Sequence, residues 1–224
     1  RFKKDFTLLP SFSKIGKTWN LNSSCSISDV VSNAIKYGNI LGHELKNVGV
    51  DLSFTPVLDI DWARSKVIGD RSFGSDPHKV SVIASSMMHG LLMSGMKNCA
   101  KHFPGHGWAL SDSHFEDAID ERKFEDIEKN DLVPYKVLCG FNGPIFSVMP
   151  SHVTYTNCDK NPASFSNFWI NEILRKKLKF EGIVISDDLS MAAAKIHKTI
   201  TDSVYCALNA GCDAILICNK RDLV

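Results

Sequence analysis

Short apolar runs alternate with longer helical patterns along the chain. The runs that predict β-strands are residues 51–60, 97–102, 144–149, 182–186 and 214–218. The run at 182–186 is rich in β-branched residues, which is typical of a strand buried on both faces of a parallel sheet. Pro56 leaves the register of the first run open, because proline cannot donate a hydrogen bond to a neighbouring strand.

Apolar residues at helical spacing fill the intervals between these runs. The predicted helices are residues 29–48, 77–94, 132–139, 167–179 and 202–210. Ser28 is the predicted N-cap of the first helix, and Asp76 caps the second, with Pro77 in its first turn. Met87 and Met88 are interpreted as core residues of the second helix. The alternation of strands and helices predicts an α/β protein with a parallel sheet.

Two architectures fit this alternation, an open doubly wound sheet and a (β/α)8 barrel. No GxGxxG or P-loop pattern follows a strand, which disfavours a nucleotide-binding open sheet. Polar residues instead lie at the end of each predicted strand or directly after it. They are Asp59 and Asp61, Lys101 and His102, His152, Asp187 and Asp188, and Asn219 and Lys220. Polar groups at the carboxyl ends of successive strands favour the (β/α)8 TIM-type barrel.

The composition supports a folded domain and disfavours two classes of partner. Of the 224 residues, 44% are hydrophobic and 23% are charged, which excludes a disordered chain. Lys and Arg number 26 and Asp and Glu 25, so a net charge of +1 gives no electrostatic reason to expect nucleic acid or an anionic membrane. No apolar run reaches the roughly 20 residues that a membrane-spanning helix needs.

The cysteines indicate a reducing compartment. There are seven, an odd number, and no CxxC pair occurs, which argues against a disulfide framework or a zinc ribbon. Cys99 and Cys218 lie inside apolar runs, so we expect them to be small core residues. A cytoplasmic location is the simplest interpretation.

The densest polar segment is residues 101–114, KHFPGHGWALSDSH, which holds three of the eight histidines. Gly105 and Gly107 predict a shaped loop rather than a helix. The histidines are either incidental surface residues, part of a metal site or part of a catalytic pair. A metal site would use His102, His106, Asp112 and His114. In a catalytic pair, Asp112 would orient the ring of His114. Spacing alone leaves these last two interpretations open.

Two further segments carry candidate chemistry. Asp187 and Asp188 follow a predicted buried strand, where a carboxylate can serve as nucleophile, base or metal ligand. We expect Asp187 to point into the site and Asp188 to have a structural or capping role. Arg71 lies between two glycines in the GDRSFG segment, and its guanidinium could hold a polar ligand.

Five segments together resemble one known family. They are PVLDI at Pro56, GDRSFGSDP at Gly69, KHFPGHG with DSH at 101–114, SHV at Ser151 and SDDLSM at Ser186. The chain resembles bacterial NagZ-type β-N-acetylglucosaminidases (β-hexosaminidases) of glycoside hydrolase family three over essentially all of its residues. The spacing of KHFPGHG and DSH is highly specific, and SDDLSM follows at the expected distance.

The resemblance implies a (β/α)8 barrel and a retaining exo-glycosidase. Such enzymes remove terminal β-linked N-acetylglucosamine from muropeptides during peptidoglycan recycling in the cytoplasm. By motif position, Asp187 is the expected nucleophile, His114 the acid/base and Asp112 its partner. The expected sugar-binding residues are Arg1, Arg71, Lys101 and His102. The family uses no metal or other cofactor, so His106 is expected to shape the loop, and we expect a monomer.

One departure from the family affects the domain organisation. The family's DxEGGRV segment is not in this chain, and Arg1 matches the arginine that closes the EGGRVQR segment. The family places three further strands before Arg1, and its last helix continues past Val224. We therefore expect residues 1–224 to be a single catalytic barrel domain that is truncated at both ends.

Three other functions remain open from the sequence. A histidine acid/base tolerates a phosphate anion better than a carboxylate would, so the enzyme could be a phosphorolytic β-N-acetylglucosaminidase. A metal-dependent hydrolase could use the histidine-rich loop together with Asp187. A muropeptide-binding protein would keep the pocket without turnover.

Overall fold

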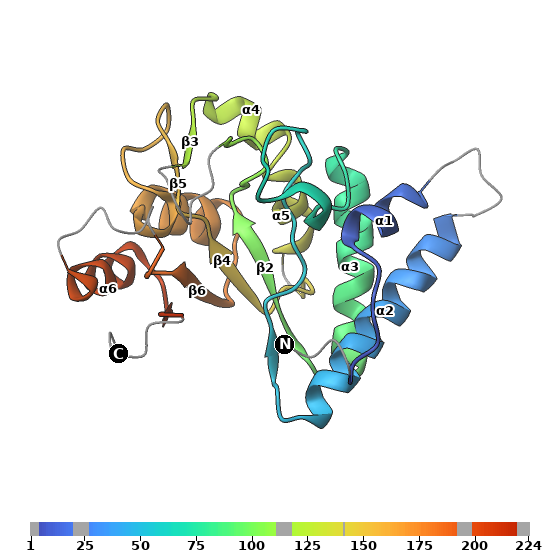
Figure 1. Cartoon of the computed structure of the whole chain (residues 1–224). Helices are drawn as coiled ribbons and strands as arrows, with labels where there is room; N and C mark the ends of the chain where they lie inside the picture. The colour runs from blue at the N-terminus through green and yellow to red at the C-terminus, as the bar shows by residue number, and fades with distance from the viewer. Residues whose placement is uncertain (1–4, 20–26, 111–117, 141, 192–198, 219–224) are drawn as a thin grey trace.

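A five-stranded parallel sheet forms the centre of the protein (Figure 1). The computed structural model describes residues 5–19, 27–110, 118–140, 142–191 and 199–218. The strands in their order across the sheet are β1 Leu52–Ser53, β2 Lys97–Phe103, β4 Ser147–Pro150, β6 Ile183–Asp188 and β7 Ala214–Leu216. Every neighbouring pair is parallel, which confirms the α/β class predicted from the sequence.

The strand order favours barrel-type winding over a doubly wound sheet. The five strands of this sheet lie side by side in the order in which they occur along the chain. In a doubly wound fold the order reverses at a switch point, and these strands show no such reversal. They form an open sheet in which β1 and β7 are the outer strands. The closed (β/α)8 barrel that we predicted is therefore present only as an arc of neighbouring strands in the part of the chain that is described.

The first predicted strand is the one that the structure shortens most. Residues 51–60 form only the two-residue strand β1, followed by a single parallel bridge between Val57 and Lys101. Pro56 lies between these two points of pairing and has no N–H to donate. The backbone N–H of Leu58 then donates to the carbonyl of Lys101 at 2.6 Å, so the segment still follows β2 toward its carboxyl end.

The five predicted helices are present. They are α2 Ile27–Asn47, α3 Pro77–Met93, α5 Val133–Leu138, the π-helix η3 Phe168–Lys177 and α6 Ile200–Ala210. Asp76 caps α3 as predicted, because its carboxylate accepts from the backbone N–H groups of His78 and Lys79. The prediction that Ser28 is an N-cap is wrong, since α2 begins one residue earlier and places Ser28 in its first turn.

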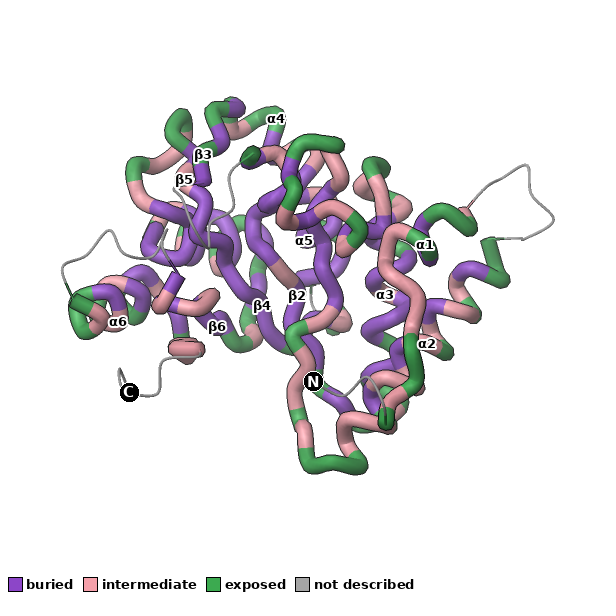
Figure 2. The backbone as a smooth tube through the Cα atoms, viewed as in Figure 1, coloured by how far each residue is buried: buried purple, intermediate pink, exposed green. Residues whose placement is uncertain are grey.

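Helices α2 and α3 pack closely at one side of the sheet (Figure 1). A Cβ atom at Gly38 would lie 2.1 Å from the carbonyl oxygen of Met87, and one at Gly90 would lie 2.0 Å from that of Ile35. Glycine is therefore required where the two helix backbones approach. Much of α3 is buried (Figure 2). Met87 and Met88 are among its fully buried residues, which confirms that they are core residues.

Several short elements were not predicted. They are α1 Phe12–Lys17, η1 Gly69–Arg71, β3 Ala118–Asp120, α4 Phe124–Lys129, β5 Val153–Tyr155 and η2 Ala163–Phe165. Strands β3 and β5 pair in parallel as a separate two-stranded sheet. Because β5 begins three residues after β4 ends, this small sheet lies beyond the carboxyl end of the central sheet.

Two remaining sequence predictions concern cysteine and the membrane. Cys99 is buried as predicted, whereas Cys218 is only half-buried because it lies beyond the end of β7. The helices in the described part of the chain all fall short of the length and apolar character that crossing a bilayer demands.

Candidate active site

Polar residues from three parts of the sequence meet at the carboxyl ends of the parallel strands. Lys101 and His102 lie near the end of β2, and Asp187 lies near the end of β6. Arg71 comes from η1, and its Nη2 atom lies 3.5 Å from Nε2 of His102. The carboxyl ends of parallel strands share one edge of the sheet, which brings these four predicted site residues together.

A buried carboxylate holds His102 in place. Asp59 is 1% exposed, and its Oδ2 atom lies 2.6 Å from Nδ1 of His102. Its Oδ1 atom accepts the backbone N–H of His106 at 2.7 Å, and both oxygens lie 3.3 Å from the backbone nitrogen of His102. Burial alone would raise the pKa of Asp59, but His102 and the N–H of His106 lower it below its usual value. The Asp59 carboxylate therefore fixes both the ring and the backbone of the segment that opens the histidine-rich loop.

The partners of the His102 ring determine which nitrogen carries hydrogen. Arg71 can only donate, so Nε2 of His102 accepts from it. The Nδ1 atom then carries the hydrogen and donates it to Asp59. Lys101 lies next to this arrangement, and burial together with the charge of Arg71 lowers the pKa of its ammonium group.

The half-buried Asp187 carboxylate is held in its ionised form. Burial alone would raise its pKa, but the neighbouring His152 and His102 rings lower it below the usual value of an aspartate. The backbone N–H of Asp188, which donates to Oδ1 of Asp187 at 2.8 Å, acts in the same direction, as does the charge of Lys101. An ionised carboxylate with restricted access to water is suited to act as a nucleophile or a base.

Asp188 has the structural role that the sequence predicted. Its Oδ1 atom accepts the backbone N–H groups of Ser190 and Cys218, both at 2.9 Å, and its Oδ2 atom accepts the hydroxyl of Ser190. The two adjacent acids therefore have different surroundings. Asp188 ties the end of β6 to the segment after β7, and this leaves Asp187 available for chemistry.

His152 is hydrogen-bonded to the same end of β6. Its Nε2 atom lies 3.1 Å from the carbonyl oxygen of Asp188, and its Nδ1 atom lies 2.5 Å from the hydroxyl of Ser164. A carbonyl can only accept, so Nε2 carries the hydrogen and Nδ1 accepts from Ser164. The ring is 1% exposed, and burial lowers its pKa, which favours the neutral form.

A pocket of about 290 Å³ opens beside the site. It is lined by Pro10, Ser11, Phe12, Phe54, Thr55, Val57, Asp70, Arg71 and Lys101. The ring of Phe12 stacks on Phe73 at 4.4 Å, so α1 supports the loop that carries Arg71. Two cationic side chains and aromatic faces in one pocket provide both polar and apolar contacts for a small polar ligand.

The whole chain, residues 1–224, matches the family described as the glycosyl hydrolase family 3 N terminal domain. The chain belongs to this family. It is 45% identical over 224 residues to a β-hexosaminidase of Bordetella avium, a match that covers 100% of this chain and 62% of the relative. The family 3 chain therefore spans somewhat less than two thirds of the length of that relative.

Solved structures with the same fold include two bacterial proteins. One is NagZ from Neisseria gonorrhoeae in complex with N-trifluoroacetyl-D-glucosamine, with a TM-score of 0.89 and 40% identity, covering 98% of this chain and 62% of that chain. The other is a β-N-acetylglucosaminidase from Thermotoga maritima, with a TM-score of 0.82 and 31% identity, covering 98% of this chain and 44% of that chain. The open sheet of the family 3 chain is thus the half-barrel of a family 3 N-terminal domain.

Three predicted site residues, Arg1, Asp112 and His114, lie outside the described residues. Their roles stay predictions from the motif. The segments that flank 111–117 are described, and the first of them contains His106, which is buried against the Asp59 carboxylate. This position agrees with the expectation that His106 shapes the loop.

The predicted metal site is described only in part, because Asp112 and His114 lie outside the described residues. Within residues 5–19, 27–110, 118–140, 142–191 and 199–218, no three His, Cys, Asp or Glu side chains are grouped as metal ligands. One nitrogen of His102 faces Asp59, and the guanidinium of Arg71 faces the other. A cation on that second nitrogen would lie against a permanent positive charge.

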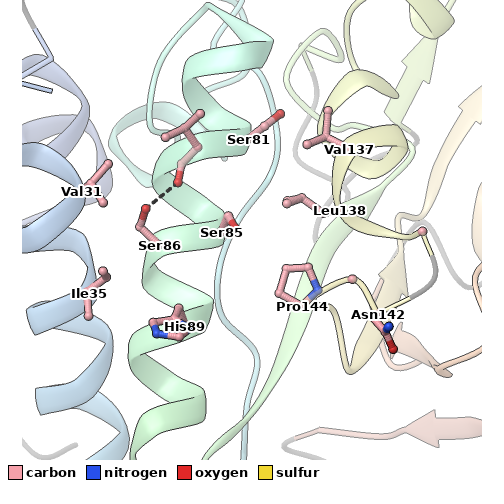
Figure 3. Close-up of a pocket in the computed structure, with 13 residues that line it drawn as sticks. Val31, Ile35, Ser81, Ser85, Ser86, His89, Val137, Leu138, Asn142 and Pro144 are labelled. Atoms are coloured by element: carbon pink, nitrogen blue, oxygen red, sulfur yellow. Dashed lines mark hydrogen bonds between the residues drawn. The ribbon is translucent and has the colours of Figure 1, made fainter. Parts of the chain in front are cut away.

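A larger groove of about 640 Å³ lies away from these residues (Figure 3). Its lining comes from α2, α3, the end of α5 and the segment that leads into the amino end of β4. Arg71, Lys101, His102 and Asp187 do not line it. Size alone therefore does not identify the site, whereas convergent polar groups do.

Sequence reasoning missed the supporting roles of Asp59, His152 and Ser164. Asp59 and His152 follow predicted strands, and this position was a usable signal. Their partners lie 43 and 12 residues away in the sequence, at distances that no local pattern encodes. Ser164 lies in the short helix η2, for which no periodic pattern was visible.

Proposed function

We propose that the protein is a retaining exo-glycosidase that hydrolyses terminal β-linked N-acetylglucosamine. The observation that carries the proposal is the position of the Asp187 carboxylate at the end of β6, beside Lys101, His102 and Arg71. The names of the relatives support the same activity: the Bordetella avium protein is a β-hexosaminidase, and the Neisseria gonorrhoeae structure holds N-trifluoroacetyl-D-glucosamine.

In the first step, a carboxylate oxygen of Asp187 attacks the anomeric carbon of the sugar. The bond from that carbon to the leaving oxygen breaks, and His114 donates a proton to the leaving oxygen. In the second step, water attacks the same carbon while His114 takes its proton, and Asp187 leaves as a carboxylate. Two inversions give net retention at the anomeric carbon.

The cationic groups provide binding and orientation in this scheme. Arg71 and Lys101 donate hydrogen bonds to sugar hydroxyl groups, and Arg1 is a further donor. Asp59 keeps His102 in one orientation, so that its Nε2 edge faces Arg71 and the sugar. Holding the sugar at a fixed distance from Asp187 lowers the entropic part of the barrier.

The proposed substrates are muropeptides released from peptidoglycan, hydrolysed in the cytoplasm as part of cell-wall recycling. The proposed catalytic unit is a (β/α)8 barrel, of which the described strands form an arc. Muropeptides that end in N-acetylglucosamine carry the sugar named in the Thermotoga maritima β-N-acetylglucosaminidase, and this sugar is a hexosamine, as the name of the Bordetella avium β-hexosaminidase requires.

An aryl N-acetyl-β-glucosaminide tests the proposal with the intact gene product. We expect release of the phenol, and we expect Asp187→Asn to lower kcat by roughly 10⁴-fold or more, because the attacking carboxylate is gone. Asp51→Asn is the matched control, since Asp51 is an exposed carboxylate that pairs with Lys46 on the surface. Absence of release by the wild-type protein, or equal rates for Asp187→Asn and wild type, contradicts the proposal.

The same assay separates the alternative chemistries. Hydrolysis yields free N-acetylglucosamine whether or not inorganic phosphate is present. Formation of a sugar 1-phosphate on addition of phosphate would instead show phosphorolysis. Full activity in the presence of a chelator is expected, and loss of activity restored by a divalent metal would show a metal-dependent hydrolase.

A further inference from the structure

Arg122 contacts both sides of the segment that contains Asp112 and His114. Its guanidinium carbon lies 4.7 Å from the ring centre of Trp108, which precedes that segment. Its Nε and Nη2 atoms donate to the carboxylate of Asp120, which follows the segment, at 2.6–3.1 Å. Arg122, which itself follows residues 111–117, therefore contacts one residue shortly before them and one shortly after them.

The Arg122 contacts are buried and directional. Asp120 is 0% exposed and Arg122 8% exposed, so water competes little for their hydrogen bonds. Nη1 of Arg122 donates to Oδ2 of Asp131 at 2.7 Å, which adds a second carboxylate to the first. Burial alone would lower the pKa of Arg122, but the hydrogen bonds that its guanidinium donates to Asp120 and Asp131 raise it, so the group stays charged. A planar guanidinium can satisfy both carboxylates at once, and an ammonium group cannot.

Asp131 extends this anchor to the beginning of the histidine-rich loop. Its Oδ1 atom accepts the indole N–H of Trp62 at 3.1 Å. A Cβ atom at Gly105 would lie 2.7 Å from the same oxygen, so the loop backbone runs directly against Asp131. The rings of Trp62 and Trp108 meet edge to face at 5.3 Å. The beginning of the loop, the ring of Trp108 and the end of β3 are thus held by one connected set of side chains.

We propose that Arg122 is a positioning residue for the acid/base step of the reaction. It holds the two flanks of residues 111–117 at a fixed separation, and the seven residues between them include the predicted acid/base His114 and its partner Asp112. Proton transfer depends steeply on the placement of the acid relative to the leaving oxygen. Arg122 itself contacts neither substrate nor reacting atoms. This inference rests on the proposed glycosidase function.

The dependence of rate on the leaving group distinguishes this role from a merely structural one. A weakly acidic phenol needs a proton from the enzyme as it leaves, whereas a strongly acidic nitrophenol departs as an anion without one. A misplaced acid therefore lowers the rate of cleavage of glycosides with a weakly acidic phenol and leaves the rate for strongly acidic phenols unchanged. General loss of folded protein slows both kinds equally.

The test compares Arg122→Lys with wild type on aryl N-acetyl-β-glucosaminides whose phenols range from strongly to weakly acidic. We expect kcat/KM for the weakly acidic phenols to fall roughly 10- to 100-fold, because displacements of about 1 Å have effects of this size. With the dinitrophenyl glycoside, whose phenol is strongly acidic, we expect the rate of glycosyl-enzyme formation to change by less than about 3-fold. A plot of log kcat/KM against phenol pKa should therefore be steeper for the variant than for wild type. An unchanged dependence overturns the proposal.

Azide provides a second readout for the same variant. Azide attacks the anomeric carbon of the glycosyl-enzyme without giving up a proton, and the bond to Asp187 breaks as the carboxylate leaves. If Arg122→Lys impairs removal of the proton from water, azide should accelerate turnover of the dinitrophenyl substrate and yield a glycosyl azide. Wild type should gain little. Equal responses of the two proteins contradict the positioning role.

Two further variants control for folding. Arg175→Lys removes a comparable arginine that donates to the carboxylate of Asp213 and to the carbonyl oxygens of Phe180 and Gly182, far along the chain from the loop. It should leave the leaving-group dependence as in wild type. If Arg122→Lys does not fold, Trp108→Leu carries the test, because it removes the ring that Arg122 contacts and keeps the pairing with Asp120.

The outcomes separate this inference from the proposed function. Absence of glycosidase activity in wild type refutes the proposed function and the inference with it. Active wild type with an unchanged leaving-group dependence in folded Arg122→Lys refutes the inference alone, and where that variant does not fold, an unchanged dependence in Trp108→Leu does so. A steeper dependence in the variant that is tested, together with a normal dependence in Arg175→Lys, supports it.

Discussion

Replacement of Asp59 by asparagine tests how much the buried Asp59 carboxylate contributes to stability and to the orientation of His102. The Asp59 carboxylate accepts Nδ1–H of His102 at 2.6 Å and the backbone N–H of His106 at 2.7 Å. An asparagine keeps one oxygen and places an NH2 group where the other oxygen was. One of the two short hydrogen bonds must be lost, and two donors then face each other in a buried site.

The size of the effect follows from these contacts. Hydrogen bonds to a charged group contribute about 1.5–3 kcal/mol each, and a buried donor left unsatisfied costs about 1–3 kcal/mol. We therefore expect Asp59→Asn to lower the free energy of unfolding by about 3 kcal/mol. For a protein of this size that corresponds to a Tm lower by about 6–12 °C.

Urea unfolding followed by circular dichroism measures this difference at several pH values. The folded pKa of Asp59 lies below its ordinary value, so its stabilising contribution is fully present above about pH 4 and is lost as the pH falls through the folded value. The difference between wild type and Asp59→Asn should be constant from pH 8 to 5 and should shrink below pH 4. The variant should also raise KM, since His102 loses its fixed orientation.

A small effect would refute this reasoning. A loss of less than about 1 kcal/mol at pH 7 would mean that the two short hydrogen bonds add almost nothing to stability. Asp51→Asn serves as the control, because its carboxylate is exposed and pairs only with Lys46 at the surface. Equal destabilisation by the two substitutions would show that burial of Asp59 is irrelevant.

Two further predictions follow from close contacts in the site. Gly107→Ala places a Cβ atom 1.8 Å from the carbonyl oxygen of Ile60, so we expect a loss of about 1–3 kcal/mol in urea unfolding and a lower kcat as the loop shifts. Burial lowers the pKa of His152, so folding disfavours its protonation, and wild-type stability should fall as the pH drops below about 6.5. His152→Gln should weaken this fall between pH 7.5 and 5.5, and an unchanged slope would contradict the assignment.

The sequence predicts most of the central sheet because its strands are buried apolar runs. Strands β2, β6 and β7 begin within one residue of the predicted positions, and β4 lies at the end of its predicted run. The helices α2 and α3 have a clear apolar periodicity, and Asp76 caps α3, so their bounds are close to the prediction. The short elements β3, β5 and α4 have too few residues for a periodic signal, and contacts with the rest of the fold stabilise them.

The sequence predicts the proposed reacting residues but not the residues that support them. Asp187 and Asp188 directly follow a run of buried apolar residues, so the local sequence alone places them at the end of a strand. The different surroundings of the two acids agree with the prediction. The pairing of His102 with Asp59 spans 43 residues, and that of Trp62 with Asp131 spans 69. Such pairs depend on the strand order and on loop paths, which no short motif encodes.

The central claim is that Asp187 forms a covalent bond to the sugar. The most direct measurement mixes the intact gene product with a dinitrophenyl N-acetyl-β-glucosaminide, stops the reaction with acid during turnover and determines the mass of the protein. We predict a mass increase of one N-acetylhexosamine residue, mapped by peptide analysis to Asp187 and absent in Asp187→Asn. Rapid turnover without any adduct, or an adduct on another residue, would contradict the account.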